Sequence, residues 1–260
     1  GLRVTSNGNA LRGLWIRDFS GDGLAIIGAA NNQFGRTECT PVGGIYSTGN
    51  GGFGIRISGE AADGNLLSSH HVGSDGVTAM GNALGGLLID GGADGNVIGG
   101  YGCYGGHYLS NLGPGIKLHG AATTGNLIRV AEVGSVALPN SGHGVLIDGA
   151  SGTVMSYVVS VIGNSGDGIR IEAGDDNVFD GNGYGVIHGN GGLGINLVAP
   201  GDPPNGVTPN DPGDADSGPN GLLNHPVILA LTSLGGGNYL VRGRACGGCL
   251  VTVFRDGADP

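Results

Sequence analysis

A short pattern of glycine followed by alternating apolar residues recurs along most of the chain. It occurs in seven copies, and the second glycine of each Gly-X-Gly falls at Gly23, Gly54, Gly86, Gly115, Gly144, Gly168 and Gly194. The steps between these glycines are 31, 32, 29, 29, 24 and 26 residues. Because apolar residues at every second position suit a strand with one buried face, each copy predicts a half-buried β-strand.

The two apolar positions of every copy hold branched aliphatic residues. They are Leu24 and Ile26, Ile55 and Ile57, Leu87 and Ile89, Ile116 and Leu118, Val145 and Ile147, Ile169 and Ile171, and Ile195 and Leu197. A fixed inward position in every copy predicts that equivalent residues stack over one another inside one core.

Asparagine recurs in phase with the glycines. Six asparagines lie four residues before the second glycine of a copy, and four more precede an apolar pair: Asn50, Asn82, Asn111, Asn140, Asn164 and Asn190, then Asn65, Asn96, Asn126 and Asn177. Asparagine tolerates the left-handed backbone of tight turns, and stacked amides can hydrogen-bond from copy to copy. The pattern therefore predicts stacked turns.

One repeat has the size of one coil of a parallel β-helix, in which about three short strands each pair with their equivalents one coil further on. At ~4.8 Å per coil, about seven coils over residues 1–199 predict a rod roughly 34 Å long. The GxGIxI, GNxI and IGN segments, phased in this way, resemble the right-handed parallel β-helix proteins of the pectate-lyase-like superfamily, especially bacterial secreted and surface proteins. This resemblance covers roughly residues 3–199 and implies an all-β fold and an extracellular or cell-surface location.

Composition agrees with this fold and excludes other classes. Glycine and proline together make up 71 of the 260 residues, but no collagen period occurs and 39% of residues are hydrophobic, so a core forms. Glycine is too frequent for long helices. The net charge of −10 argues against nucleic-acid binding. No long apolar run and no leader-like N-terminus occur, so we expect neither membrane insertion nor a signal peptide, as in a mature piece of a protein.

The repeat stops near residue 200. Residues 200–224 form an acidic loop rich in proline, asparagine and aspartate, and residues 225–260 resemble the opening strands of an incomplete Ig-like β-sandwich. Only 36 residues remain there against about 100 in a complete Ig-type domain. That last domain is therefore truncated, folded back on the rod, or completed by another chain.

Two pairs of cysteines differ in their expected state. Cys246 and Cys249 favour a small-loop disulfide over a redox or zinc pair, because no βαβ context and no further zinc ligands are visible. Cys39 and Cys103 lie at similar positions two coils apart, which is ~9.6 Å, so we expect free thiols unless their loops bend toward each other.

The outward positions of the repeated strand form two columns with ionisable residues at mid-rod. One column is Ala25, Arg56, Leu88, Lys117, Leu146, Arg170 and Asn196, and the other is Ile27, Ser58, Asp90, His119, Asp148, Glu172 and Val198. The candidate ligand-binding residues are Arg56, Asp90, Lys117, His119, Asp148 and Arg170. If the face is catalytic, the candidates are Lys117, His119, Asp148, Arg170 and Glu172.

The resemblance implies how such a face would act on a glycan. Enzymes of the superfamily bind polysaccharide on one outward face and use arginine or lysine to remove a proton, or paired carboxylates to hydrolyse. Asp148 and Glu172, one coil apart, would match the spacing of a retaining glycosidase, and Asp90 with Asp148 would approach an inverting one. Any parallel ladder gives these spacings, however, so the favoured interpretation of the columns is an ion-pair ladder that keeps the face soluble.

Other motifs carry weaker signals. The Gly-His-Gly around His143 and the paired aspartates Asp175 and Asp176 resemble polygalacturonases, but in the reverse order, and the Asp-Pro-His signature of alginate epimerases is missing. His70 and His71 would point to opposite faces of a strand, so they would not share a metal ion. The cluster Asp211, Asp214, Asp216 and Asn220 is a candidate calcium site, with a solvated acidic turn as the alternative.

Three functions follow, in order of preference. The first is an extracellular structural or adhesive module without catalysis, which associates with itself, as in a filament, or with neighbouring surface proteins. The second is a polysaccharide lyase or glycoside hydrolase that acts on an acidic glycan. The third is glycan binding without chemistry, which ranks last because the ionisable face lacks exposed aromatic residues. We expect either no cofactor or calcium.

Overall fold

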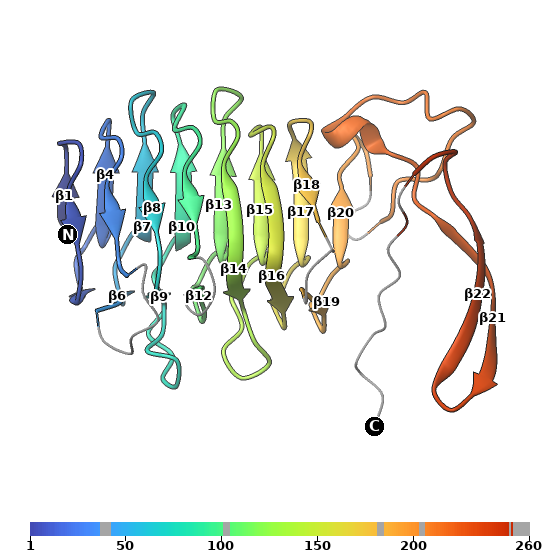
Figure 1. Ribbon diagram of the computed structural model, residues 1–260, viewed down its shortest axis with the longest axis horizontal. Coiled ribbons are helices and arrows are strands. Elements are labelled where there is room, and N and C mark those ends of the chain that lie inside the picture. Colours follow the sequence, from blue (N-terminus) through green and yellow to red (C-terminus); the bar gives the residue numbers. More distant parts are fainter. Residues whose placement is uncertain (37–42, 101–104, 181–184, 203–205, 250, 252–260) are drawn as a thin grey trace.

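The computed structural model describes residues 1–36, 43–100, 105–180, 185–202, 206–249 and 251. These residues form a parallel β-helix followed by a loop region and an antiparallel hairpin (Figure 1). The only helix among them is a short 3-10 helix, η1 (Pro219–Leu222). No helix in the described ranges is long and apolar enough to cross a membrane. The predicted all-β parallel β-helix is therefore confirmed.

The first sheet is built from the repeated Gly-X-Gly strands. Its strands in stacking order are β1 (Leu2–Val4), β4 (Leu24–Ile27), β7 (Phe53–Ser58), β10 (Gly85–Asp90), β13 (Ile116–His119), β15 (Val145–Asp148), β17 (Ile169–Ala173) and β20 (Ile195–Leu197). All neighbouring pairs are parallel, and Leu87 pairs with Ile55 on one side and Ile116 on the other. The predicted stacking register is confirmed.

The second and third faces of the coil belong to one folded sheet. The second face contains β2 (Ala10–Leu11), β5 (Gln33–Phe34), β8 (Leu66–Leu67), β11 (Val97–Ile98), the first halves of β14 (Leu127–Val133) and β16 (Val154–Ile162), and β18 (Val178–Phe179). The third face contains β3 (Leu14–Arg17), β6 (Ile45–Thr48), β9 (His70–Val72), β12 (Gly106–Tyr108), the second halves of β14 and β16, and β19 (Ile187–His188).

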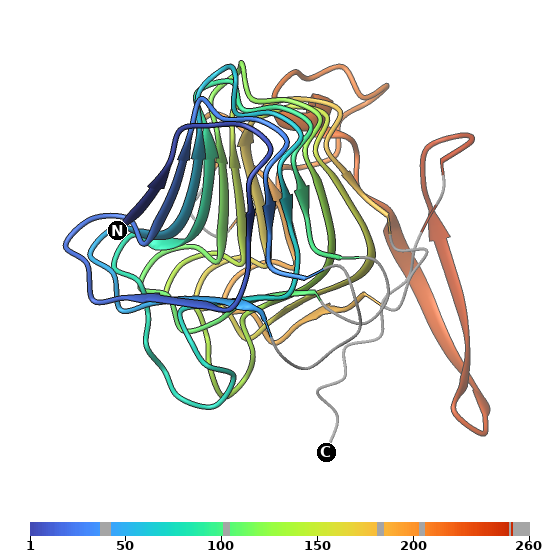
Figure 2. The ribbon, with the colours of Figure 1, turned by 60° about the vertical axis from the view of Figure 1, so that its left-hand side comes forward.

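The corner between these two faces is set by residues in the left-handed backbone region. Val130 within β14 has φ 47° and Tyr157 within β16 has φ 61°, and Ser69 between β8 and β9 has φ 48°. The ladder between β14 and β16 shifts register at the same place, as a β-bulge does. Figure 2, which looks more nearly along the rod, shows the coils superposed around one interior.

The interior is a column of aliphatic side chains flanked by two asparagine ladders. In the first ladder the Asn82 amide donates to Asn111 Oδ1 at 2.9 Å, Asn111 donates to Asn140 at 3.0 Å, and Asn140 donates to Asn164 at 2.9 Å. These four side chains are buried. The predicted stacked asparagine turns are confirmed.

The glycines of the repeat make room for this ladder. A Cβ on Gly54 would lie 2.6 Å from Nδ2 of Asn82, and one on Gly115 would lie 2.8 Å from Nδ2 of Asn140. The phase between glycine and asparagine in the sequence therefore has a steric cause.

A second ladder runs along the turns before the second face. It links Asn9, Asn32, Asn65, Asn96 and Asn126 by amide-to-amide bonds of 2.8–3.1 Å, and Asn177 continues it to Asn220. The equivalent position in the coil between Asn126 and Asn177 holds Thr153, whose buried Oγ1 has no hydrogen-bond partner within the described part of the chain.

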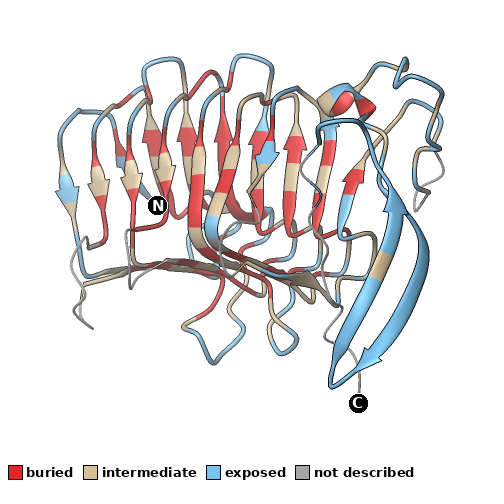
Figure 3. Cartoon of the chain, turned by 45° about the vertical axis from the view of Figure 1, so that its right-hand side comes forward, coloured by how far each residue is buried: buried red, intermediate tan, exposed pale blue. Residues whose placement is uncertain are grey.

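The hairpin of β21 (Val227–Gly235) and β22 (Asn238–Arg244) is the least buried part of the described chain. All nine residues of β21 are exposed, including Ile228 and Leu231, each at 63% (Figure 3). The Ig-like sandwich expected here is not shown, because the described residues of this segment contribute two strands.

Candidate functional site

The outward face of the first sheet carries the predicted ionisable residues. We call the outward residues of one strand a rung, and rungs of different character alternate along the rod. Registered pairs place Arg56 beside Leu88, Leu88 beside Lys117, Lys117 beside Leu146, and Leu146 beside Arg170. The strands with a central leucine end on an acid, Asp90 in β10 and Asp148 in β15. From β7 to β15, strands with a central cation thus alternate with strands that end on an acid, and Asp90 and Asp148 each pair with a cation on a neighbouring strand.

The first of these pairs joins Arg56 to Asp90. Arg56 Nη2 lies 2.7 Å from Asp90 Oδ2 and Nε lies 3.4 Å from Oδ1, so the guanidinium faces the carboxylate with two nitrogens. The Asp90 side chain is only 13% exposed, whereas that of Arg56 is 38% exposed. Burial of the acid beneath its partner makes this pair a fixed element of the face.

The centre of the face is a cluster in which Asp148 faces two basic groups. His119 Nδ1 lies 2.8 Å from Asp148 Oδ2, and Lys117 Nζ lies 3.5 Å from the same oxygen. His119 is the most exposed of the three, with 52% of its side chain accessible. A carboxylate at Nδ1 orients the imidazole and leaves Nε2 to exchange a proton with a ligand.

The next rung departs from the predicted column. The ladder between β15 and β17 shifts register after Ile147, so Asp148 pairs with Ala173 rather than with Glu172. The Glu172 carboxylate instead accepts a hydrogen bond from Nε of Arg170 at 2.7 Å. The expectation that Glu172 would be the direct neighbour of Asp148 is therefore wrong, and the cause is a β-bulge that lengthens β17.

Arg170 also contacts the most buried acid of this region, Asp167. Arg170 Nη1 lies 3.1 Å from Asp167 Oδ2, which also accepts from Asn196 Nδ2 at 2.9 Å, while Oδ1 accepts from the Leu193 N–H at 2.8 Å. Burial raises the pKa of Asp167, but these hydrogen bonds outweigh it and leave the pKa below its ordinary value. Asp167 therefore fixes the next coil in the way that Asp22 does through the Phe53 N–H.

His143, the histidine of the Gly-His-Gly segment, packs beside this acid. Its Nδ1 accepts a hydrogen bond from the Asp167 N–H at 2.9 Å. Burial lowers its pKa, and Arg170 lowers it further against the opposing charge of Asp167. A neutral imidazole that accepts a backbone hydrogen bond is explained as a structural contact between coils.

A second outward stripe, on the third face, was missed in the sequence. Registered pairs join Trp15 to Tyr46, Tyr46 to His71, His71 to His107, and His107 to Glu132. The Tyr46 and His71 rings stack at 4.8 Å between centroids, and His71 and His107 stack at 4.6 Å. A signal was present, because Trp15, Tyr46 and His107 each lie eight residues before the second glycine of the next copy.

The two histidines of this stripe differ in their surroundings. Burial and the nearby His107 lower the pKa of His71 to about 4. His107 Nδ1 lies 2.7 Å from Glu132 Oε2, and this hydrogen bond lowers the pKa of Glu132. His107 and Glu132 also line an open hollow of about 320 Å³ with Ser160.

His70, next to His71, points into the core as the alternation predicts. It is buried, and its Nε2 lies 2.5 Å from the Tyr108 hydroxyl. Burial lowers its pKa to about 3. The two adjacent histidines thus face opposite sides of β9 and do not share a ligand.

The acidic loop brings together three of the four residues proposed for calcium. Carboxylate oxygens of Asp211, Asp214 and Asp216 lie within 4.8 Å of one another. Partial burial and the two neighbouring carboxylates raise the pKa of Asp216. The fourth residue, Asn220, is used elsewhere, because its Oδ1 accepts from the Asn177 N–H at 3.0 Å at the end of the second ladder.

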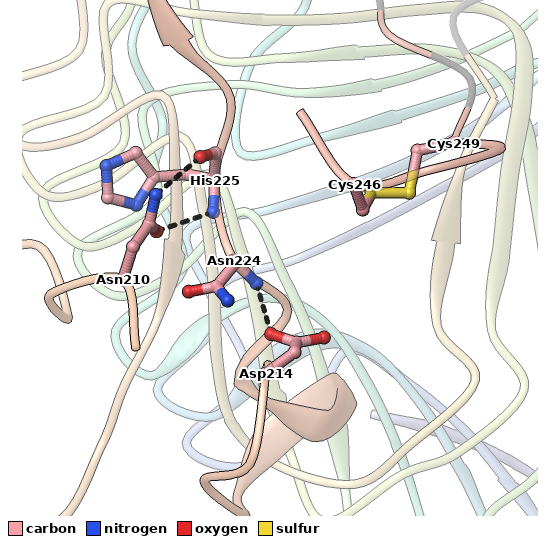
Figure 4. The surroundings of a disulfide bond; sticks show 6 residues. All are labelled: Asn210, Asp214, Asn224, His225, Cys246 and Cys249. Carbon is pink, nitrogen blue, oxygen red and sulfur yellow. Dashed lines mark hydrogen bonds between the residues drawn. A yellow bond between two sulfur atoms is a disulfide. The ribbon is translucent and has the colours of Figure 1, made fainter. Parts of the chain in front are cut away.

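The acidic loop is tied to the base of the hairpin. Asp214 Oδ1 accepts a hydrogen bond from the Asn224 N–H at 2.7 Å (Figure 4). The side-chain amide of Asn210 donates to the His225 carbonyl and accepts from the His225 N–H. Cys246 and Cys249 form a disulfide nearby, with Cα atoms 5.5 Å apart. Cys39 and Cys103 lie outside the described residues.

Comparison with known proteins identifies the fold and leaves the family open. No protein-family model matches the chain, and no curated protein matches it. Among solved structures, the crystal structure of the periplasmic alginate epimerase AlgG matches with a TM-score of 0.53 at 18% identity, over 72% of this chain and 41% of that one. A mutant of the same enzyme matches with a TM-score of 0.53 at 19% identity, over 76% and 44%. The chain thus spans less than half the length of these structures, with which it shares the β-helix fold.

Proposed function

We propose that this chain is a polysaccharide-active β-helix that binds an anionic glycan along the outward face of its first sheet. The observation that carries the proposal is the cluster of Lys117, His119 and Asp148. It combines an oriented, half-exposed imidazole with a lysine on one carboxylate, at the centre of a regular charged face. A solubilising ion-pair ladder needs alternating charges, but it does not need a histidine whose ring is aligned by an acid.

The charged face runs along the rod, and this suits a chain-like ligand. Equivalent side chains repeat along the rod at ~4.8 Å, and an extended glycan advances by about one such spacing per sugar. A glycan laid along the rod therefore meets each rung with a similar part of each sugar. The likeness in fold to a carbohydrate-modifying enzyme supports this choice over a purely structural role.

The chemistry open to the cluster is proton transfer beside a uronate carboxylate. Lys117 neutralises that carboxylate, which acidifies the adjacent C–H, and Nε2 of His119 takes the proton while Asp148 stabilises the resulting imidazolium. The carbanion then either expels the glycosidic oxygen, which takes up a proton, or is reprotonated on carbon. Hydrolysis by Asp148 with Glu172 loses its geometric basis, because the bulge in β17 removes their direct pairing.

The test is incubation with defined uronate oligosaccharides in heavy water. We expect one of two results: deuterium at the carbon next to the carboxylate, read by NMR, if the carbanion is reprotonated, or the absorbance of unsaturated products if it expels the glycosidic oxygen. New reducing ends with neither unsaturation nor deuterium at that carbon would contradict proton abstraction and favour hydrolysis. Absence of both binding and turnover across acidic glycans would remove the proposal.

The same proposal places the protein outside the cytoplasm, where such glycans occur. The periplasmic location of the enzyme with a similar fold supports an exported protein. Immunolocalisation in the source cells, with a cytoplasmic marker as control, tests this point.

A second candidate is the structural or adhesive module, favoured by the exposed hairpin. Apolar side chains such as Ile228, Leu231 and Leu234 are 63–65% exposed on a sheet that contains two strands, with unpaired outer edges, among the residues that the structure describes. Such edges favour association with another chain. Sedimentation over a wide concentration range tests it, and a mass that stays constant at one copy would exclude self-association.

A further inference from the structure

The charged face has a repeat of two rungs rather than one. Its central column reads cation, leucine, cation, leucine, cation, from Arg56 in β7 to Arg170 in β17, with Lys117 midway. Successive cations are therefore two strand spacings apart, ~9.6 Å, and the five rungs span about 19 Å.

The leucine rungs differ from the basic rungs in the groups that a bound sugar would contact. Leu88 and Leu146 occupy the central column, and each leucine strand ends on an acid, Asp90 or Asp148. A carboxylate accepts hydrogen bonds from sugar hydroxyls and repels another anion. The leucine rungs therefore suit an uncharged sugar, whereas the basic rungs suit a charged one.

The overall charge balance of the face points the same way. Arg56, Lys117 and Arg170 are matched by Asp90, Asp148 and Glu172, each within 3.5 Å of a cation, and Arg170 also contacts the buried Asp167. A polymer with a carboxylate on every sugar would place like charges over the acidic rungs. A polymer with one carboxylate per disaccharide places its charges two rungs apart, in register with the cations.

We infer that the preferred ligand is a glycan in which a uronate alternates with an uncharged sugar, rather than a homopolymer of uronates. This inference rests on the proposed function and narrows its substrate class. In the bound register each uronate carboxylate faces Arg56, Lys117 or Arg170, and each uncharged sugar lies over Leu88 or Leu146. The more exposed of the two acids, Asp148, accepts a hydrogen bond from a sugar hydroxyl there.

The structure offers a substitution that changes the period without removing a charged group. Leu146 is half-buried on the central column, between Lys117 and Arg170. Leu146→Lys puts cations on three consecutive rungs. Ser160→Lys is the matched control, because Ser160 is an outward residue of similar burial on the third face, beside Glu132.

The experiment is calorimetric titration of the full chain and both variants with three decasaccharides. The probes are an alternating glucuronate and N-acetylglucosamine polymer, a homopolymer of galacturonate, and uncharged cello-oligosaccharide. Circular dichroism and melting curves confirm that each variant is folded. We expect the natural chain to bind the alternating probe at least about tenfold more tightly than the homopolymer.

The two variants then distinguish the effect of the cation spacing from the effect of one added positive charge. Leu146→Lys is expected to shift the ratio of the two affinities toward the homopolymer by about five- to tenfold, while Ser160→Lys leaves the ratio unchanged. Homopolymer binding as tight as or tighter than the alternating probe, or an equal shift with Ser160→Lys, would overturn the inference and leave the proposed function standing. Failure of both acidic probes to bind would overturn both.

Discussion

The aromatic stripe of the third face and the charged face of the first sheet both arise because equivalent residues stack on neighbouring strands. They differ in how far their side chains remain exposed. On the third face the rings of Tyr46, His71 and His107 lie on neighbouring strands, so they stack and cover one another's faces. On the first sheet the residues next to Lys117 and His119 are of other types, and both side chains contact Asp148 instead. The edge of the His119 ring therefore stays in solvent. In a column of similar rings, each ring is covered by its neighbours. In a column where residue types alternate, polar side-chain groups stay exposed and can contact a ligand.

The largest expected effect comes from removing the exposed imidazole of the charged face. His119→Gln keeps a polar side chain of similar size but no group that can take a proton. We expect proton exchange into a uronate substrate to fall by about 10²- to 10⁴-fold, the usual contribution of a general base. Deuterium incorporation followed by NMR measures it.

The matched control for that change is His107→Gln, the same substitution on the aromatic stripe. It removes the bond to Glu132 but lies on another face. We expect glycan turnover within about twofold of the natural chain. A comparable loss in both variants would mean that the first sheet is not the reaction site.

A second test uses the histidine behind the stripe, His70, which is buried and neutral. Its pKa of about 3 in the folded chain lies below 6.5, so the unfolded chain binds more protons between these values. Stability therefore falls as pH falls from about 6.5 toward 3, by roughly 3 kcal/mol at pH 4.

The double variant His70→Phe with Tyr108→Phe removes the titrating group and its buried partner together. We expect urea unfolding of this variant to lose less free energy between pH 7 and pH 4 than the natural chain does. An unchanged difference between the two pH values would show that His70 does not control acid stability.

The sequence predicted the fold because the residues that define it obey a strict spacing. The inward aliphatics, the glycines and the asparagines all follow the coil period, and the observed register pairs them as expected. The site was predicted in part, because the bulge after Ile147 depends on backbone geometry that the pattern does not contain. The aromatic stripe was missed because insertions after His71 and Glu132, before the next repeat glycine, hide a spacing that Trp15, Tyr46 and His107 keep.

A third test measures how much the interior ladders support both stripes. Asn111→Ala removes the acceptor of two hydrogen bonds from Asn82, its backbone N–H and its amide, in a buried site. We expect a loss of about 2–4 kcal/mol in the free energy of unfolding, because buried donors are left unpaired. A loss below about 0.5 kcal/mol would contradict a structural role for the ladder.

The opposite change completes the second ladder. Thr153 interrupts it between Asn126 and Asn177 with a buried hydroxyl that no described residue hydrogen-bonds. We expect Thr153→Asn to raise the free energy of unfolding by about 1 kcal/mol, since it restores an amide to the series. Lower stability in urea unfolding would show that the coil has no room for the amide.

The smallest effect concerns the acidic loop, which lies apart from both stripes. If Asp211, Asp214 and Asp216 bind calcium, millimolar Ca²⁺ raises the melting temperature of the natural chain by a few degrees. Asp214→Asn is expected to reduce the shift. Equal melting temperatures with Ca²⁺ and with a chelator would exclude the site.

The most direct measurement is a crystal structure of the chain with a bound decasaccharide of alternating uronate and uncharged sugar. The glycan should lie along β7 to β17, with one uronate beside Lys117 and His119 and its neighbours over Leu88 and Leu146. A glycan bound along Trp15 to His107, or across the strands instead of along the rod, would contradict the account.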